Sequence, residues 1–278
     1  MKNKVLTGLL LVLIGGWGNL LAQNAGSNYA RQVNTLIGTK GVGLTSGYLY
    51  PGATYPYGMV QFTPSYFSKR SGFVINQLSG GGCEHMGNFP TFPVKGKLKM
   101  SPDNILNYRI NISEEKGHAG YYEAMVQEDI KAKLTVTERT GMASYEYPAD
   151  QQYGTVIIGG GISATPIEQA AIVITATNKC EGYAEGGNFC GLRTPYKVYF
   201  VAEFDADALE SGTWKRDELK PNITFAEGEY SGVYFTFDVS KKKNVQYKIG
   251  VSYVSVENAR ENLKAENTGW DFLQIQNQ

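Results

Sequence analysis

The chain has few of the side chains that build most metal and redox sites. It contains only two histidines, His85 and His118, and three cysteines, Cys83, Cys180 and Cys190. No two of these cysteines have the short spacing that is usual for ligands of a structural zinc ion. We therefore expect no zinc site in this chain.

An excess of charge of either sign is also absent. The chain has 26 Lys and Arg residues and 26 Asp and Glu residues, so its formal net charge at pH 7 is zero. Proteins that bind nucleic acid or an anionic membrane surface usually carry a basic patch and a positive charge. The composition therefore argues against both kinds of partner, and it is compatible with a neutral ligand such as a sugar.

The longest apolar run lies at the beginning of the chain. Residues 1–22 combine Lys2 and Lys4 with an apolar centre at 5–14 and end in the small residue Ala22. This pattern predicts a cleaved secretory signal peptide, because the apolar run is short for a membrane anchor. We expect the mature chain to be exported, to the periplasm, the cell surface or the medium, and to have no membrane span.

In an exported protein the cysteines are candidates for disulfide bonds. Cys180 and Cys190 flank a glycine-rich segment and are the closest pair in sequence, so a bond between them is one interpretation. Cys83 would then remain unpaired. The alternative is that the cysteines are free thiols, in which case Cys83 is expected to act as a small hydrophobic side chain.

Alternation of apolar and polar residues dominates the rest of the sequence. It is clearest at 130–137 and at 245–253, and it indicates strands with one buried face. Further short apolar runs, separated by Gly, Asn, Asp or Ser clusters, lie at 155–158, 171–176, 198–204 and 232–239. This spacing is typical of an antiparallel β-sandwich rather than of β-α-β units. We therefore predict a mainly all-β fold, an antiparallel β-sandwich of many strands.

One helix is predicted near the end of the chain. Ser255 is a suitable N-cap, and Val256, Ala259 and Leu263 lie on one face of a helix that continues to Asn267.

The segment from Gly72 to Gly96, GFVINQLSGGGCEHMGNFPTFPVKG, contains the strongest local signal. Its three consecutive glycines, Gly80 to Gly82, allow positive φ angles and a close approach to another surface. The turn also carries a cysteine, a glutamate and a histidine. A second block rich in glycine, proline and tyrosine, PGATYPYGM, lies upstream at 51–59.

Together these blocks resemble the N-terminal domain of glycoside hydrolase family 92, the calcium-dependent exo-α-mannosidases. The resemblance begins with VNTLIGT at 33–39 and continues through PGATYPYGMVQ and LSGGGC. Further matches follow in order: GYY at 120–122, LTVTERTGMASYEY at 134–147 and SYVSVENARENLKAE at 252–266. One departure is the strand before the glycines, where Asn76 and Gln77 stand at a place that often holds histidine in this family.

The resemblance implies the domain organisation. Residues 1–22 would be the signal peptide, 23–254 the β-sandwich domain, and 255–278 a linker helix toward an (α/α)6 catalytic domain that this chain lacks. By the same resemblance, that helical domain supplies the general acid, the general base and most ligands of the catalytic Ca²⁺. We therefore expect no catalytic residue and no metal ligand here, and solvated or ion-paired roles for Glu84, Glu138, Glu146 and Asp150.

In complete form, a protein of this kind would remove terminal α-mannosides from N-glycans or mannans by an inverting, calcium-dependent mechanism. The domain by itself would support and line the active site and be inactive. A different interpretation is a stand-alone carbohydrate-binding module or surface glycan-binding protein that keeps the sandwich without the hydrolase.

By the same resemblance, the glycine-rich loop faces the catalytic domain. The loop would then line a sugar subsite, with Glu84 and His85 bonding to hydroxyl groups; the alternative is a tight structural turn. Tyrosines around the PGA turn, including Tyr48 and Tyr50, would either stack on a pyranose or contribute to packing. The candidate substrate-binding residues are Ser79, Gly80, Gly81, Gly82, Cys83, Glu84, His85, Tyr55 and Tyr57.

Overall fold

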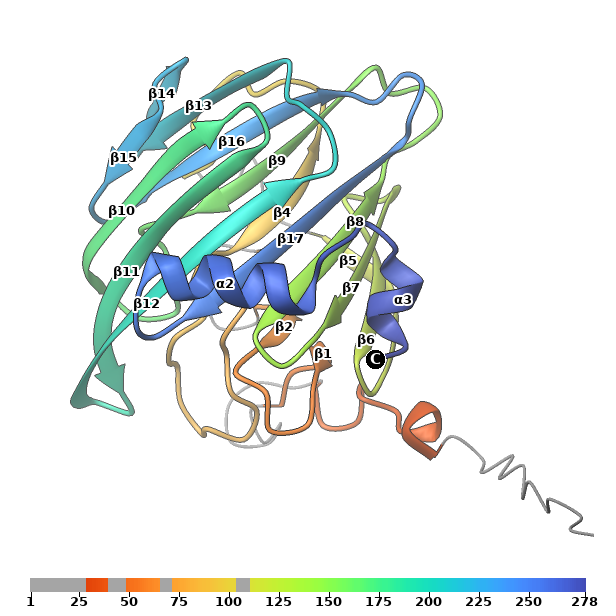
Figure 1. Ribbon diagram of the computed structural model, residues 1–278, viewed down its shortest axis with the longest axis vertical. Helices are drawn as coiled ribbons and strands as arrows, with labels where there is room; N and C mark the ends of the chain where they lie inside the picture. Colours follow the sequence, from red (N-terminus) through yellow and green to blue (C-terminus); the bar gives the residue numbers. More distant parts are fainter. Residues whose placement is uncertain (1–28, 40–48, 66–71, 104–110) are drawn as a thin grey trace, which may run out of the picture.

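The structure, a computed structural model, describes residues 29–39, 49–65, 72–103 and 111–278. The predicted signal peptide and Tyr48 lie outside these residues. In the described ranges the chain forms two antiparallel sheets that face each other, one of eight and one of nine strands (Figure 1). The predicted antiparallel β-sandwich is therefore confirmed.

The eight-stranded sheet has the order β1-β2-β3-β4-β9-β16-β13-β14. Its strands, in that order, are Ala53–Thr54, Gln61–Pro64, Phe73–Val74, Thr91–Lys95, Tyr153–Gly159, Ser231–Asp238, Glu210–Lys215 and Glu218–Pro221.

The nine-stranded sheet has the order β15-β10-β11-β12-β17-β8-β7-β6-β5. Its strands, in that order, are Phe225–Glu227, Ile167–Ala176, Lys179–Phe189, Leu192–Phe204, Asn244–Ser252, Thr140–Glu146, Ile130–Val136, Tyr121–Val126 and Ile112–His118.

Large apolar side chains fill the space between the two sheets. Phe204 on β12 lies in ring contact with Phe235 and Phe237 on β16 and with Tyr247 on β17, at centroid distances of 4.9, 5.1 and 5.3 Å. All four rings are almost fully buried. The alternation predicted at 245–253 and the apolar runs predicted at 198–204 and 232–239 therefore contribute to a shared core, where burial of apolar surface is the main stabilising term.

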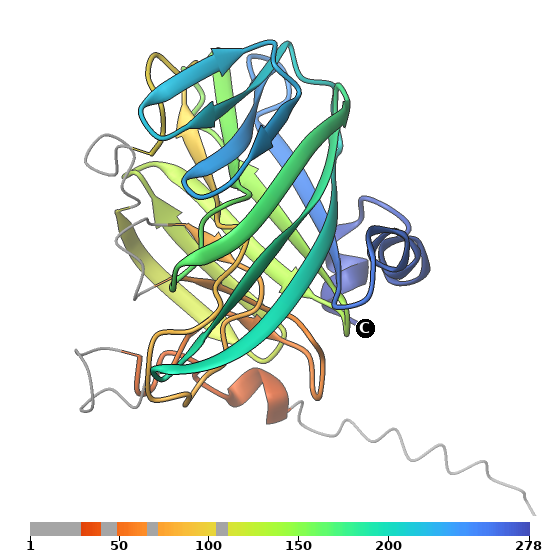
Figure 2. The same ribbon diagram turned by 90° about the vertical axis from the view of Figure 1, so that its left-hand side faces the viewer.

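Helix α2, Val256–Glu266, covers the outer face of the nine-stranded sheet over β12 and β17 (Figure 2). The predicted N-cap is confirmed, because the Ser255 side chain accepts a hydrogen bond from the backbone N–H of Asn258 at 3.1 Å. Ala259 and Leu263 are buried against the sheet. Below them, a Cβ atom on Gly250 would lie 2.4 Å from the carbonyl oxygen of Ala259, so only glycine allows the helix to approach this closely.

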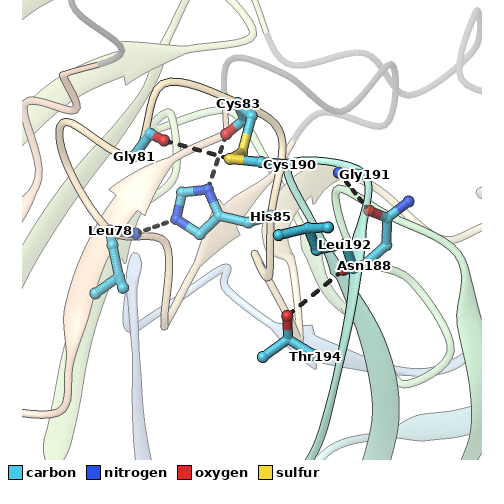
Figure 3. The surroundings of a disulfide bond; sticks show 9 residues. All are labelled: Leu78, Gly81, Cys83, His85, Asn188, Cys190, Gly191, Leu192 and Thr194. Atoms are coloured by element: carbon cyan, nitrogen blue, oxygen red, sulfur yellow. Dashed lines mark hydrogen bonds between the residues drawn. A yellow bond between two sulfur atoms is a disulfide. The ribbon is translucent and has the colours of Figure 1, made fainter.

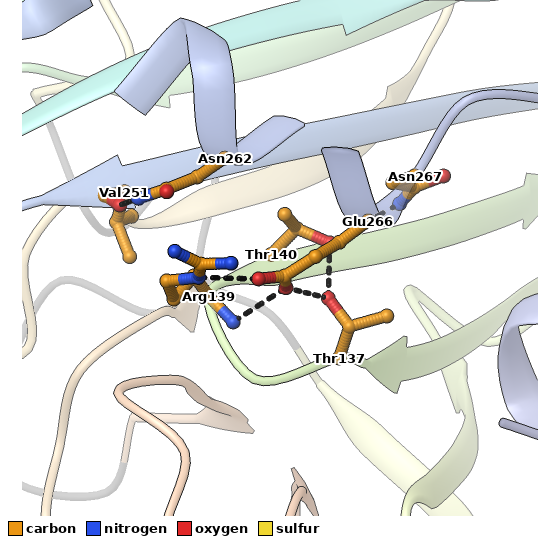
Figure 4. A network of polar contacts seen from close by, with 7 residues as sticks. All are labelled: Thr137, Arg139, Thr140, Val251, Asn262, Glu266 and Asn267. Carbon is orange, nitrogen blue, oxygen red and sulfur yellow. Dashed lines mark hydrogen bonds and ion pairs between the residues drawn. The ribbon is translucent and has the colours of Figure 1, made fainter. Parts of the chain in front are cut away.

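The end of α2 is tied to the β7–β8 turn by a polar network (Figure 4). One carboxylate oxygen of Glu266 accepts from the hydroxyl of Thr137 at 2.6 Å and from the backbone N–H of Arg139 at 2.8 Å. The Arg139 guanidinium pairs with the other oxygen. Asn262 on α2 also donates to the carbonyl of Val251 on β17, at 2.8 Å. Polar contacts as well as apolar burial therefore fix this helix.

The segment after α2 also rests on the sandwich. Lys248 of β17 donates to the carbonyl of Asn267 at 3.0 Å and lies 4.5 Å from the centroid of the Trp270 ring. A short helix, α3, follows at Phe272–Gln276, and Phe272 contacts Tyr121 of β6 in an edge geometry at 6.2 Å. The single-turn helix η1, Tyr29–Gln32, lies at the other end of the described chain. The assignment of 255–278 as a linker between domains stays a prediction.

Within the described ranges, none of the helices has the length and apolar character needed to cross a membrane.

Candidate functional site

A surface pocket of about 470 Å³ opens at the end of the sandwich that carries the PGA turn and the glycine-rich loop. Its walls come from the segment before β1, from β2, from the loop after β3 and from the β5–β6 turn. The lining residues are Thr35, Ile37, Leu49, Tyr50, Gly52, Thr54, Gly58, Met59, Val60, Gln61, Leu78, Ser79 and Ala119. The pocket is thus mainly apolar, with a few hydroxyl and amide groups, as is usual for small-molecule sites.

Ser79 is the predicted site residue that lines this pocket. Its Oγ accepts a hydrogen bond from the Gln61 side-chain Nε2 at 2.8 Å and another from the backbone N–H of Tyr50 at 3.2 Å. Across the pocket, the Thr35 hydroxyl donates to the carbonyl of Pro51 at 3.0 Å. Ser79 therefore joins the glycine-rich loop to both β2 and the PGA turn.

His85 has a structural environment (Figure 3). The imidazole is fully buried; its Nδ1 donates to the carbonyl of Cys83 at 2.9 Å and its Nε2 accepts from the backbone N–H of Leu78 at 3.0 Å. The edge of the ring also meets Phe189 of β11, with centroids 5.0 Å apart. Both nitrogens are thus engaged by the loop's own backbone in this conformation, which favours the structural interpretation for His85. The sugar-subsite role of the loop stays a prediction.

The three glycines meet two different needs. Gly80 and Gly82 have φ angles of +77° and +74°, the left-handed conformation that glycine adopts without strain. Gly81 needs space instead, because a Cβ atom there would lie 2.8 Å from Cε1 of His85. The turn therefore closes tightly around the imidazole ring.

The predicted disulfide between Cys180 and Cys190 is wrong. Cys190 is bonded to Cys83, with a Cα–Cα distance of 5.3 Å, and Cys180 is a buried free thiol. The reason is that β11 occupies the residues between Cys180 and Cys190, and an extended strand of that length separates its ends by about 33 Å. Cys180 instead faces the core, where burial raises the pKa of its thiol.

The remaining predicted residues do not line the pocket. Glu84 is exposed at the loop surface, and Tyr57 projects fully into solvent from a residue with φ of +59°. Tyr55 is partly exposed. One predicted residue, Ser79, thus lines the pocket, and the sequence analysis did not single out Gln61 and Thr35, which also line it; their motifs, PYGMVQ and VNTLIGT, were the available signal. A ligand role for any of these residues stays a prediction.

Asn76 and Gln77 are buried behind the loop and do not reach the pocket. Asn76 donates to the side-chain oxygen of Asn88 at 2.9 Å and accepts from the backbone N–H of Asn88 at 2.8 Å. The same oxygen of Asn88 accepts from the hydroxyl of Tyr196 at 3.0 Å, and burial raises the pKa of Tyr196 to about 12. Asn76 is therefore joined to Asn88, and Asn88 is joined to β12 through Tyr196.

Metal ligands do not gather in the described part of the chain. No group of three or more His, Cys, Asp and Glu side chains there is placed to hold a metal ion. Calcium prefers a cradle of several oxygen ligands that includes carboxylates, and the pocket lining has none among its described residues. The pocket residues that the structure describes therefore do not fit a calcium site of their own.

Comparisons with known proteins agree with this geometry. The solved structure of the GH92 family glycosyl hydrolase ccman5 has a TM-score of 0.79 at 22% identity, over 90% of this chain and 36% of that chain; this likeness concerns the fold. A family GH92 α-mannosidase from Bacteroides thetaiotaomicron, solved with mannoimidazole, has a TM-score of 0.75 at 25% identity, over 89% of this chain and 35% of that chain.

A similar curated protein is an uncharacterized secreted glycosidase from Arthroderma benhamiae, 26% identical over 88% of this chain and 36% of that protein. The chain thus spans about a third of the length of these relatives. Residues 32–252 match the sequence model of the glycosyl hydrolase family 92 N-terminal domain. Because this match covers most of the chain, the protein belongs to glycoside hydrolase family 92, of which it contains the N-terminal domain.

Proposed function

We propose that this chain is the non-catalytic part of an exported α-mannosidase, which supports a helical catalytic domain and lines a subsite for a terminal α-mannoside of an N-glycan or mannan. The observation that carries the proposal is the family match over residues 32–252 together with the pocket that lies within it. The complete enzyme would use Ca²⁺ and an inverting mechanism.

The chemistry of the pocket supports a non-catalytic role. Hydrolysis of a glycoside needs one carboxyl group as a proton donor and a second as a base or nucleophile. Among the described residues that line the pocket, none carries a carboxylate or an imidazole. The catalytic groups and the metal ligands would therefore come from the helical domain, and the chain by itself would not turn over substrate.

Apolar side chains around the pocket offer a surface for that partner. Ile37 and Leu78 are exposed at the pocket itself. Leu192 is exposed beside the disulfide, and Val254 is exposed next to Tyr253, whose hydroxyl accepts from Asn76 at 3.4 Å. A grouping of exposed apolar residues at one end of a domain favours an interface, here with a helical domain of the same or another chain.

Export is supported by two observations. The curated relative is described as a secreted glycosidase, and the Cys83–Cys190 disulfide is a bond that persists in oxidising compartments. We propose cleavage of the leader after about residue 22 and release to the periplasm, the cell surface or the medium.

The test is hydrolysis of 4-nitrophenyl α-D-mannopyranoside and α-mannobiose by the chain alone and by the chain joined to the helical domain of a relative. We expect turnover only in the joined protein, and loss of that turnover when EDTA removes Ca²⁺. Turnover by the chain alone that Glu84→Gln abolishes would contradict the proposal. Calorimetric titration of the chain alone should detect no tight Ca²⁺ site.

A glycan-binding protein without hydrolase activity is a second candidate. It is favoured by one observation, namely that residues of this chain line a mainly apolar pocket that also carries hydroxyl and amide groups. Binding of methyl α-D-mannopyranoside with unchanged affinity after joining to the helical domain, and no hydrolysis in either form, would support this candidate over the first.

A further inference from the structure

We infer that Ser79 acts in the pocket only as a hydrogen-bond donor, and that it thereby selects ligands that place an oxygen acceptor against it. The inference rests on the proposed function, because the acceptor is taken to be a hydroxyl or ether oxygen of a mannoside. It adds to that function a specific residue and the direction of its hydrogen bond, in which the protein donates and the ligand accepts.

The hydrogen bonds of Ser79 determine this polarity. A serine hydroxyl has one proton to donate and two lone pairs that accept. Both lone pairs are engaged, one by the Gln61 Nε2 at 2.8 Å and the other by the Tyr50 backbone N–H at 3.2 Å. The proton is the remaining hydrogen-bonding capacity of the group, and Ser79 is an exposed residue that lines the pocket.

The two donors to Ser79 are held in place. Gln61 is 8% exposed, and its backbone N–H donates to the carbonyl of Ile75 at 3.0 Å. Its Cα pairs with that of Thr54 across the β1–β2 ladder. The Tyr50 N–H belongs to the backbone of a residue that is almost fully buried. The backbone of Gln61 is thus fixed in the sheet and its side chain is almost fully buried, and the Tyr50 N–H belongs to a buried stretch of backbone.

The loop that carries Ser79 is also closed on itself. The His85 ring joins the backbone of Leu78, just before Ser79, to that of Cys83. Cys83 is in turn bonded to Cys190 at the tip of the β11–β12 hairpin (Figure 3). This double attachment pre-organises the hydroxyl, which reduces the entropy lost when a ligand binds.

The consequence is a defined preference among ligands. An oxygen of a hydroxyl or ether can accept from Ser79, whereas an ammonium group at the same position has only protons and would be rejected. Thr35 has the opposite polarity, because its proton is donated to Pro51 and only its lone pairs remain. A ligand rich in hydroxyl groups satisfies both, since each hydroxyl donates and accepts.

The test is a ligand-observed NMR titration of the full chain with methyl α-D-mannopyranoside and the set of its mono-deoxy analogues. One analogue should bind the wild-type chain about five- to tenfold more weakly, because its missing oxygen leaves the Ser79 proton without a partner. In Ser79→Ala the parent mannoside should bind as weakly as that analogue, and the difference between the two should disappear.

Gln61→Glu tests the polarity rather than the presence of the hydroxyl. A carboxylate at position 61 accepts the Ser79 proton, so this variant should lose affinity as Ser79→Ala does although the serine is intact. Glu218→Gln, an exposed change on β14 at the opposite edge of the eight-stranded sheet from β1, is the control and should keep the wild-type pattern. Thermal melts check that each variant is folded. If Gln61→Glu does not fold, Ser79→Ala still tests the inference, because it changes an exposed side chain.

The outcomes separate the inference from the function on which it rests. The inference is wrong, and the pocket remains a mannoside site, in either of two cases. In the first, mannosides bind but each deoxy analogue loses the same affinity in Ser79→Ala as in the wild type. In the second, folded Gln61→Glu binds mannosides as tightly as the wild type. If no mannoside binds the wild-type chain, the assignment of the pocket to mannosides fails, and the inference fails with it.

Discussion

Helix α2 and the glycine-rich loop are both held against the sheets, but by different kinds of interaction. Helix α2 contributes Ala259 and Leu263 to an apolar contact and adds the tie from Glu266 to Arg139. The loop from Leu78 to His85 has no comparable apolar face; a buried imidazole and a disulfide hold it. A periodic segment can use many weak contacts, whereas an irregular one depends on a few strong ones.

This difference predicts that loss of the disulfide should lower stability more at the loop than loss of one side-chain contact lowers it at α2. Four experiments would break or sharpen the comparison, and they are given in order of expected effect.

Loss of the disulfide should have the largest effect. Cys83 and Cys190 are 107 residues apart, and closing a loop of that size stabilises a folded chain by about 3–5 kcal/mol. Replacement of both by serine should lower the free energy of unfolding in urea by about this amount and expose residues 79–82 to protease. Dithiothreitol should destabilise the wild-type chain and have no effect on the double variant.

The matched control for this experiment is Cys180→Ala. Cys180 is buried and unbonded, so its removal should cost about 1 kcal/mol for the lost packing and should leave the effect of dithiothreitol unchanged. A serine double variant as stable as the wild type would show that the disulfide does not hold the loop.

Crowding at the helix contact should have the next largest effect. In Gly250→Ala the added Cβ would lie 2.4 Å from the Ala259 carbonyl oxygen and 2.8 Å from the Leu263 Cβ, so α2 must move away from β17. We expect a loss of about 2–3 kcal/mol in urea unfolding and faster hydrogen exchange in α2. Gly269→Ala, where the nearest atom is 4.0 Å away, should change stability little; equal effects in the two variants would contradict this account.

Removal of the polar tie should have a smaller effect. Glu266→Gln keeps the shape of the side chain but leaves Arg139 without its counter-charge, and Glu266 is only 13% exposed. The expected loss is about 1–2 kcal/mol, with faster amide exchange in the last turn of α2. Glu261→Gln, on the exposed side of the same helix, should be neutral. If the two variants behave alike, apolar burial alone holds the helix.

Acidification should produce the smallest effect on the helix side. Burial tends to raise the pKa of Glu203, but Lys179 and Lys248 outweigh it, and the pKa lies below its ordinary value of 4.5. Because the folded-state pKa is the lower one, this stabilisation is present above the unfolded value and is lost as the pH falls through the folded value. The free energy of unfolding in urea, measured between pH 7 and pH 3, should show this loss. In Glu203→Gln the free energy of unfolding should change less steeply with pH. An unchanged pH dependence would show that Glu203 does not contribute.

Much of the architecture could be predicted because it depends on local pattern. The alternation at 130–137 became β7, and the helix predicted from Ser255 to Asn267 became α2 with the expected N-cap. The short helix α3 was not predicted, since five residues are too few to show a helical period. Lys248, Gly250 and Ser252 are buried on the second face of β17, which could not be foreseen because α2 covers that face.

The candidate site was predicted less completely. Ser79 of the predicted loop lines the pocket, whereas His85 is part of the loop's own structure. Cysteine pairing was wrong because proximity in sequence is a poor guide once a strand lies between two residues. Gln61 was missed, since nothing in its own neighbourhood marks a strand residue that bonds to a serine 18 positions away.

The sequence by itself determined the period of the strands, the start and end of α2 and the membership of family 92, because each of these is encoded by neighbouring residues or ordered motifs. Only the tertiary structure decided that Cys83 bonds to Cys190, that His85 closes the loop, and that Gln61 and Tyr50 orient Ser79. These contacts join distant segments, and their geometry depends on strand register and on the meeting of loops at one end of the sandwich.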